Sequence, residues 1–452
     1  MCFFIFVRPV IVRPNPDQRH SFPALLFFPA IPHPLDDMTP TITSLLLVTG
    51  LAFSYFAAAA SSASGDWPAW RGPTRDGLAA PGQNPPTHWS ETENILWKVP
   101  LPGRGHGSPT VVGDRIYLPT ADSVQQSQSV ICLDRNSGTT IWQTEVHANG
   151  ANAGKHRNSS AASSTVACDG GRVFINFLNS GAVYTTALDL GGKRLWQRKV
   201  CDYIPHQGFG SSPVVHEGLV LVSADHRGGG VIVGLKRDSG EVAWSQPRPK
   251  LPNYTTPAVV QAAGKTQMVL AGCSLISSFD PLTGKKMWEI DGSTEECVTT
   301  VVTDGERVFA SGGYPKNHVM AIQADGSGKV AWQIPARVYV PSMIAKEGHL
   351  YGVLDAGMAV CWKAETGEEL WKERLGGDFY SSPVMLGDRI YVSNLAGRTF
   401  VFGATPRSFE LISQNQLGDE AYASPVICQS RIYLRVAKHG NPRQEFLYCV
   451  GK

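Results

Sequence analysis

One short motif, a glycine followed four positions later by a tryptophan, recurs six times in this chain. The six pairs are Gly138/Trp142, Gly192/Trp196, Gly240/Trp244, Gly284/Trp288, Gly328/Trp332 and Gly367/Trp371. Successive tryptophans lie roughly 40 to 50 residues apart, which is the length of one blade in an array of small sheets. This spacing constrains the architecture of the chain more strongly than its composition does.

A second motif runs in phase with the first and begins with a serine or threonine, seven residues before an arginine or its equivalent. Its eight copies begin at Ser108, Thr165, Ser212, Thr256, Thr300, Ser342, Ser382 and Ser424. In the first copy, residues 111–112, 113–114 and 116–117 have the pattern of strand, Gly-Asp turn and strand. The glycine before each tryptophan closes a second hairpin, where it supplies a positive φ at little steric cost. Two hairpins per repeat predict a four-stranded antiparallel blade.

Eight such blades predict an all-β fold, the eight-bladed β-propeller, over residues 94–452. The last copy ends at Lys452 without its Gly-x-x-x-Trp strand, whereas a spare strand, Asn94–Val99, precedes the first copy. We therefore expect Trp97 to complete the last blade, so that the N-terminal strand pairs with the C-terminal blade. The seventh copy has Ser408-Phe409 in place of its tryptophan. An open solenoid is the structural alternative, and it would require polar capping repeats at its ends.

These repeats resemble the pyrroloquinoline-quinone (PQQ) repeat family of eight-bladed propellers, whose blades carry an Ala-Leu-Asp-x-x-Thr-Gly-x-x-x-Trp stretch. Residues 187–189, 279–288 and 365–371 match that stretch, and residues 66–73 are similar to the start of secreted PQQ-like proteins of planctomycete-type bacteria. The family includes quinoprotein dehydrogenases and the BamB type of outer-membrane assembly lipoprotein. The resemblance therefore implies the fold, and it leaves open whether the chain is an enzyme.

The segment before the propeller has the pattern of an export signal. Residues 42–60 are apolar and end in Ala58-Ala59-Ala60, which fits a cleavage site. We expect a signal peptide at 38–64, an N-terminal extension at 65–93, and a misannotated or disordered leader at 1–37, with Met38 as the true start. The mature chain would be periplasmic or secreted, without a transmembrane span. An uncleaved anchor is the alternative, because ~19 apolar residues approach the length that spans a bilayer.

The charge balance excludes one class of function, and the cysteine positions predict buried thiols. The chain has 40 Lys and Arg against 38 Asp and Glu, so it lacks the basic footprint of a nucleic-acid binder. Cys132, Cys361 and Cys449 occupy equivalent repeat positions, where we expect small buried thiols. The sequence does not decide whether five further cysteines form disulfides or remain free thiols: Cys168, Cys201, Cys273, Cys297 and Cys428.

Candidate ligand-binding residues lie just before the eight Ser/Thr positions, because those segments converge on one mouth of a propeller channel. They are His106, His156, Arg157, His206, Tyr254, Glu295, Glu296, Tyr339, Tyr380 and Tyr422. A concave mouth with aromatic walls and a few polar groups is the usual form of a ligand site. The alternative is that these are ordinary polar turn residues around a water-filled channel.

From these features we expect an exported, monomeric binding or scaffold module for a protein, a glycan or another cell-envelope component, with no cofactor and no metal. The alternative is a PQQ- and Ca²⁺-dependent dehydrogenase, whose metal needs oxygen ligands. Candidate oxygen donors are Glu295, Glu296, Asn253, Asn158 and Asp378. However, the sequence lacks the adjacent cysteine pair of quinoprotein alcohol dehydrogenases, and it identifies no catalytic residue.

Overall fold

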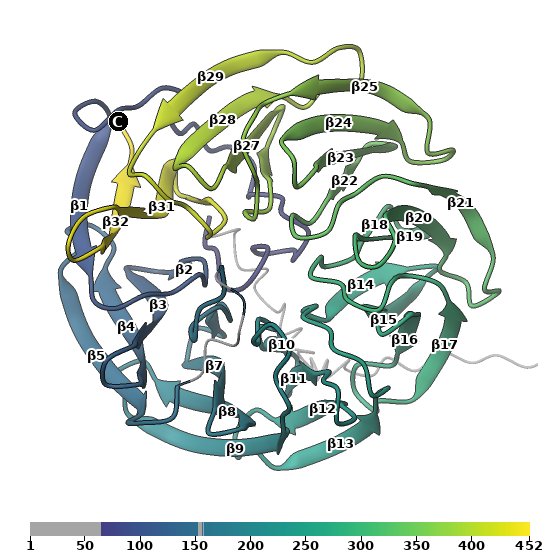
Figure 1. The fold of residues 1–452 in the computed structure, drawn as a ribbon, viewed down its shortest axis with the longest axis horizontal. Helices are drawn as coiled ribbons and strands as arrows, with labels where there is room; N and C mark the ends of the chain where they lie inside the picture. The colour runs from purple at the N-terminus through teal and green to yellow at the C-terminus, as the bar shows by residue number, and fades with distance from the viewer. Residues whose placement is uncertain (1–64, 152–155, 157) are drawn as a thin grey trace, which may run out of the picture. The chain divides into compact units, whose positions relative to one another are not determined.

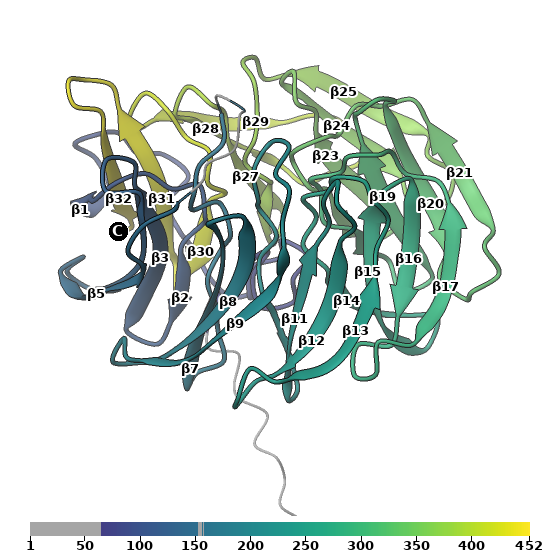
Figure 2. The ribbon, with the colours of Figure 1, turned by 60° about the horizontal axis from the view of Figure 1, so that its bottom comes forward.

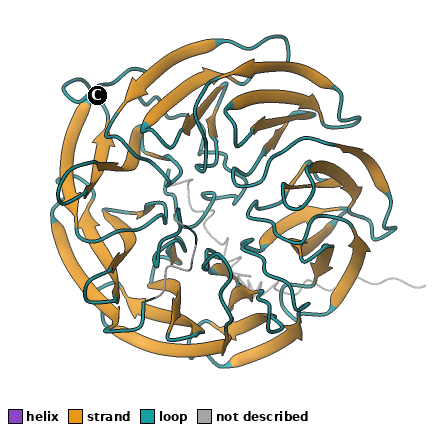
Figure 3. Ribbon diagram, in the orientation of Figure 1, coloured by secondary structure: helices purple, strands orange, loops and turns teal. Residues whose placement is uncertain are grey.

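The structure, a computed structural model, describes residues 65–151, 156 and 158–452, so the predicted leader and signal peptide lie outside the described residues. The described residues form eight four-stranded antiparallel sheets arranged as blades around a central channel (Figures 1 and 3). In each of the first seven blades, the strands follow one another from the channel outward. In the view of Figure 2, the blades stand side by side around the axis.

The strand bounds repeat with little variation. Blade 1 has β2 (Thr110–Val112), β3 (Arg115–Asp122), β4 (Ser127–Asp134) and β5 (Thr140–His147); blade 2 has β6 (Ala167–Cys168), β7 (Arg172–Asn179), β8 (Ala182–Asp189) and β9 (Arg194–Asp202). Blade 3 has β10 (Val214–His216), β11 (Leu219–Ala224), β12 (Val231–Lys236) and β13 (Val242–Pro247); blade 4 has β14 (Ala258–Ala262), β15 (Lys265–Gly272), β16 (Leu275–Phe279) and β17 (Lys286–Asp291).

The second half of the ring follows the same plan. Blade 5 has β18 (Val302–Thr303), β19 (Arg307–Gly312), β20 (His318–Gln323) and β21 (Val330–Ile334); blade 6 has β22 (Ile344–Lys346), β23 (His349–Val353), β24 (Met358–Lys363) and β25 (Glu369–Arg374). Blade 7 has β26 (Val384–Leu386), β27 (Arg389–Ser393), β28 (Arg398–Gly403) and β29 (Leu411–Gln416); blade 8 has β30 (Val426–Cys428), β31 (Arg431–Lys438), β32 (Gln444–Val450) and β1 (Ile95–Leu101).

The eighth blade confirms the predicted closure. Its strand order is β30-β31-β32-β1, and β1 pairs antiparallel with β32, with Trp97 opposite Cys449. Glu91 in the preceding extension accepts hydrogen bonds from Lys98 of β1 and Tyr448 of β32, and it pairs with Lys438 of β31. The N-terminal strand is therefore held in the blade both by its ladder and by a charged clamp.

The repeated tryptophans join neighbouring blades. Each stands on the outermost strand of its blade, and the indole N–H of Trp142 donates to Leu190 O in the next blade at 2.9 Å. The same bond to the next blade is made by Trp97, Trp196, Trp332 and Trp371. At five contacts between blades the repeat glycine of the next blade lies against the indole, whereas Gly328 lies against Ile290. Gly192, at φ 88°, has so little space that an added Cβ would lie 2.7 Å from Trp142. The Gly-x-x-x-Trp motif is therefore a contact between blades, which explains its regular spacing.

Blade 7 departs from the predicted alignment. Ser413, and not Phe409, occupies the tryptophan position, because it pairs with Val401 just before the bulge that every blade shares. Phe409 instead packs in the turn against Trp371, with ring centroids 5.6 Å apart. The N-terminal extension contacts this strand: the Ser413 hydroxyl donates to Thr87 O, and the backbone N–H of the buried Trp89 donates to Asn415 Oδ1.

The eight Ser/Thr positions form a ring of hydrogen bonds around the channel. The backbone N–H of Ser108 donates to Thr165 Oγ1, the hydroxyl oxygen at the same position of the next blade, at 3.0 Å. The same bond links six further pairs: Thr165 to Ser212, Ser212 to Thr256, Thr300 to Ser342, Ser342 to Ser382, Ser382 to Ser424, and Ser424 to Ser108. Between Thr256 and Thr300 the chain has a different arrangement, because Thr300 Oγ1 accepts the indole N–H of Trp70. The second repeat motif is therefore also a contact between blades.

Residues 65–79 close the channel at the end away from the mouth loops. This purple segment lies at the centre of the ring in Figure 1. Trp67 forms a backbone bridge to Val111 of blade 1, and Leu78 bridges Met385 of blade 7. The guanidinium of Arg71 is buried in the channel, where it donates to the carbonyl oxygens of Asp76, Met343 and Pro383. Burial lowers the pKa of Arg71 to about 10.

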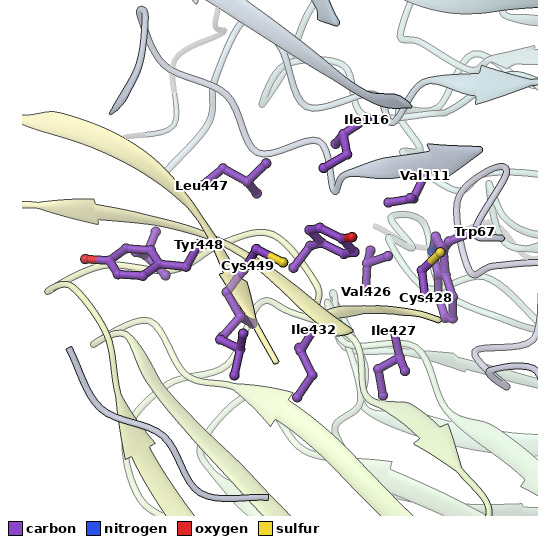
Figure 4. Close-up of a cluster of buried hydrophobic side chains, with 14 of the residues drawn as sticks. Trp67, Val111, Ile116, Val426, Ile427, Cys428, Ile432, Leu447, Tyr448 and Cys449 are labelled. Atoms are coloured by element: carbon purple, nitrogen blue, oxygen red, sulfur yellow. The ribbon is translucent and has the colours of Figure 1, made fainter. Parts of the chain in front are cut away.

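The largest hydrophobic cluster lies where the first and last blades meet. It includes Trp67 of the extension, Val111 and Ile116 of blade 1, and Cys428 and Leu447 of blade 8 (Figure 4). The extension is therefore part of the folded core.

All eight cysteines among the described residues are free thiols, which settles the five positions left open by the sequence. The repeat-equivalent ones behave as predicted: Cys132, Cys361 and Cys449 are buried, and each pairs across the ladder with a repeat tryptophan. In the described part of the chain, no helix has the length and apolarity needed to cross a bilayer.

Candidate ligand cavity at the channel mouth

A cavity of about 470 Å³ occupies the mouth of the channel. Eight of the ten residues predicted from the sequence line it: His106, His156, His206, Tyr254, Glu296, Tyr339, Tyr380 and Tyr422. They converge because each stands in the loop that enters the innermost strand of a different blade, His106 before β2 and Tyr422 before β30. Glu295 is exposed and does not line the cavity, while Arg157 lies outside the described residues.

Glu296 carries the only carboxylate among the described residues that line the cavity. Its side chain is 4% exposed, and its Oε1 lies 2.9 Å from Nδ1 of His206. The Tyr339 hydroxyl donates to Oε2 at 3.4 Å. Burial, and then the charge of Glu296, raise the pKa of both Tyr254 and Tyr339. Both phenols are therefore protonated hydrogen-bonding groups at neutral pH.

The opposite wall is an aromatic stack. The imidazole of His106 lies parallel to the ring of Tyr422, with centroids 4.0 Å apart and an interplanar angle of 12°. Tyr380 meets the same ring edge-on at 5.9 Å. Asn158 links the two tyrosines: its amide donates to the Tyr380 hydroxyl at 3.2 Å, and its carbonyl oxygen accepts from Tyr422 at 3.4 Å. The stack is thus fixed by side chains from four loops.

His106 leaves one polar atom unused. Its Nε2 is buried and has no hydrogen-bond partner among the described residues. Burial, followed by the nearby charges of Arg104, Arg435 and Arg443, holds the pKa of His106 well below its ordinary value. The imidazole is therefore neutral at pH 7, and it lies in the wall as an uncharged ring stacked on Tyr422.

Sequence reasoning missed Trp70 and Tyr314, which also line the cavity. Trp70 contributes to its floor from the extension, anchored on Thr300 230 residues away. Tyr314 stands between β19 and β20, outside the segments that precede the Ser/Thr motif. The sequence shows tryptophans at positions 67 and 70, but the repeat pattern predicts contacts only within the repeats. It therefore could not predict where the segment that precedes them packs.

The oxygen donors considered for Ca²⁺ are not gathered here. The Asn253 amide is buried in a separate network, where Nδ2 donates to Asp225 Oδ2 and Ala271 O while Oδ1 accepts the N–H of Cys297. Asp225 itself pairs with the buried Arg248 at 3.1 Å. Asp378 is exposed and does not line the cavity. Of the five candidates, Glu296 and Asn158 remain, which is far fewer than the six to eight oxygens that Ca²⁺ takes.

PQQ is a polycarboxylate, and the guanidinium groups nearest the cavity, those of Arg104 and Arg337, lie against the rings of Tyr422 and Tyr339 and do not line the cavity. No arginine or lysine is among the lining residues that the structure describes, whereas Glu296 would oppose an anion. The described residues therefore do not fit PQQ with Ca²⁺.

Comparison with known proteins finds similarity to both branches of the propeller class. The chain is 26% identical over 315 residues to the outer membrane protein assembly factor BamB of Burkholderia pseudomallei (strain K96243), covering 65% of this chain and 72% of BamB. It is 25% identical over 258 residues to a polyvinylalcohol dehydrogenase of a Pseudomonas species, covering 53% of this chain and 35% of that enzyme. Among solved structures, the quinohemoprotein alcohol dehydrogenase of Comamonas testosteroni superposes with a TM-score of 0.66 at 13% identity, over 87% of this chain and 82% of the enzyme.

The family model described as outer membrane protein assembly factor BamB matches residues 78–202, 126–357 and 315–404. These overlapping spans cover more than half of the chain, with blades 1 to 6 complete and the first three strands of blade 7. Because the match follows the repeats observed in the structure, the chain belongs to this BamB-like family of PQQ-repeat β-propellers.

Proposed function

We propose that this protein is an exported recognition module that binds a component of the cell envelope in the cavity at its channel mouth. The observation that supports this most directly is the cavity itself, which is built from eight different loops and carries the aromatic stack of His106, Tyr422 and Tyr380. Membership in the BamB-like family supports a place in the envelope, because the Burkholderia relative is named as an outer-membrane assembly factor.

The alternative is a dehydrogenase, and the similarity to the polyvinylalcohol dehydrogenase supports it. That match covers 35% of the enzyme, and the donor set around Glu296 and Asn158 does not fit PQQ with Ca²⁺. We therefore derive no redox step for this chain. Titration with PQQ and Ca²⁺, followed by tryptophan fluorescence, tests this alternative: saturable binding that needs Glu296 would revive it.

The recognition role is tested by capture. The purified protein is immobilised and incubated with the envelope fraction of the producing organism, alongside a Tyr422→Ala variant and a Tyr184→Ala control. Tyr184 is a partly buried tyrosine of β8 outside the cavity. We expect the wild type and the control to retain the same material and Tyr422→Ala to lose it. Equal capture by all three, or none by any, would contradict a recognition role for the cavity.

A further inference from the structure

Charges of both signs lie at the described cavity wall, so neither an anion nor a cation meets a wall of uniformly opposite charge. Glu296 disfavours an anion, as described above. A cation is disfavoured at the aromatic walls, because the guanidinium of Arg104 lies 5.7 Å from the ring of Tyr422 and that of Arg337 lies 5.4 Å from the ring of Tyr339. These two rings already interact with a cation, so a second one would meet like-charge repulsion. The described walls therefore favour an uncharged ligand.

The polar groups of the wall suit hydroxyls. Gln207, Asn158 and the tyrosine hydroxyls can both donate and accept, and burial, followed by Glu420, raises the pKa of Tyr422 to about 12, so this phenol stays neutral. A hydroxyl of a ligand can pair with each of these groups, since a hydroxyl both donates and accepts.

The apolar groups of the wall suit a flat ring. Tyr422 and Tyr380 on one side, Tyr339 on another and Trp70 at the floor present aromatic faces and edges to the cavity. A pyranose offers the complementary surface, with C–H groups on its faces and hydroxyls around its edge. Aromatic rings bury such apolar faces favourably while their polar tips hydrogen-bond the edge.

The shape of the channel sets which part of a glycan can enter. Trp70 and the buried Arg71 close the far end, so the cavity opens through the mouth loops and cannot be threaded by a long chain. We propose that the cavity binds the terminal, uncharged sugar units of a glycan, an inference that rests on the recognition role proposed above. Aromatic walls, neutral hydrogen-bonding groups and a closed floor are the features that select this ligand class.

The test uses defined probes on the purified protein. Cellotetraose, maltotetraose, mannotetraose and N-acetylchitotetraose represent neutral glycan ends, PQQ represents a polyanion, and tetramethylammonium represents a cation. Binding is followed by tryptophan fluorescence, to which Trp70 at the floor should respond, and by saturation-transfer NMR. We expect at least one tetrasaccharide to bind, with affinity reduced tenfold or more in Tyr422→Ala and unchanged within twofold in Tyr184→Ala.

Tyr422→Phe provides a second variant if the alanine change disturbs folding, because it removes only the hydroxyl that bonds Asn158. No binding of any tetrasaccharide at 10 millimolar, or stronger binding of PQQ or tetramethylammonium, would overturn the glycan assignment. Treating the envelope extract with periodate or with proteinase K separates the two proposals. Cavity-dependent capture that survives periodate but not protease would leave the recognition role standing and refute the glycan ligand.

Discussion

The contact between blades through the repeat tryptophans can be measured by comparing two of them. Trp371 is 8% exposed and donates its indole N–H to Thr405 O at 2.8 Å, whereas Trp244 is 9% exposed and its Nε1 has no hydrogen-bond partner in the described residues. The two side chains are therefore matched in burial; they differ in this hydrogen bond and in the ring contacts that Trp371 makes with Phe402 and Phe409. Replacing either by alanine should destabilise the protein by about 3–5 kcal/mol, the range for deleting a large buried aromatic side chain.

Replacement by phenylalanine separates packing from hydrogen bonding. Trp371→Phe removes the same part of the ring as Trp244→Phe, but it also leaves the carbonyl of Thr405 without its donor. The bond is part-buried, so water can replace the lost donor. Trp371→Phe should therefore be the more destabilising change by about 0.5–1.5 kcal/mol, the net contribution of one hydrogen bond. Trp244→Phe removes an unpaired N–H, which offsets part of its packing loss.

The assay is urea unfolding followed by far-ultraviolet circular dichroism, with Leu411→Ala as a control on an exposed side chain of β29. The control should change the free energy of unfolding by less than about 0.5 kcal/mol. If the two phenylalanine variants were equally destabilised, the hydrogen bond between blades would contribute nothing measurable. If Trp371→Ala left the midpoint unchanged, the tryptophan contact would not hold the blades together.

Three further predictions concern the closing clamp, a buried histidine and the Ser/Thr ring. Burial alone would raise the pKa of Glu91, but hydrogen bonds from Lys438, Tyr448 and Lys98 lower it from 4.5 to about 2. The stabilisation from the ionised carboxylate should therefore be present above pH 4.5 and be lost as the pH falls toward 2. Glu91→Gln and wild type should differ in melting temperature at pH 7 and converge near pH 2. Burial lowers the pKa of His318 to about 4. Because the unfolded chain binds this proton below pH 6.5 and the folded chain does not, the free energy of unfolding should fall by up to about 3 kcal/mol by pH 4. His318→Gln should flatten the pH dependence of unfolding in that window, and an unchanged slope would count against the buried neutral histidine. Ser382→Ala leaves the buried N–H of Ser342 without its acceptor and should cost about 1–3 kcal/mol, while Ser137→Ala in an exposed turn should cost less in the same denaturation series.

The fold could be read from the sequence because its two motifs are contacts between blades, and such contacts must recur once per blade. This reasoning placed Trp97 in the last blade correctly. It failed in blade 7, where the tryptophan position was sought by its distance from the turn. The true position, Ser413, is fixed by ladder register and by the bulge before Phe402. At this position the extension contacts the blade instead, since the Ser413 hydroxyl donates to the carbonyl oxygen of Thr87.

The candidate site could be predicted as far as the repeat extends. Residues just before the Ser/Thr motif converge because the blades are radially arranged, so Tyr254, Tyr339 and Tyr422 were placed without knowing any contact. Glu295 and Glu296 were not distinguished, since neighbouring side chains point to opposite sides and the sequence does not give the register. Trp70 required tertiary information, because its partner lies 230 residues away.

The closing blade also dictates an order of assembly during synthesis. β1 is the first strand of the propeller to leave the ribosome and β32 is the last, yet the two are adjacent in one sheet. Until residues 444–450 have emerged, blades 1 to 7 can be complete while the hydrogen-bonding edge of β1 has no partner. A chain cut short within β32 would therefore retain seven intact blades and present an unpaired strand edge, the kind of surface on which other chains aggregate.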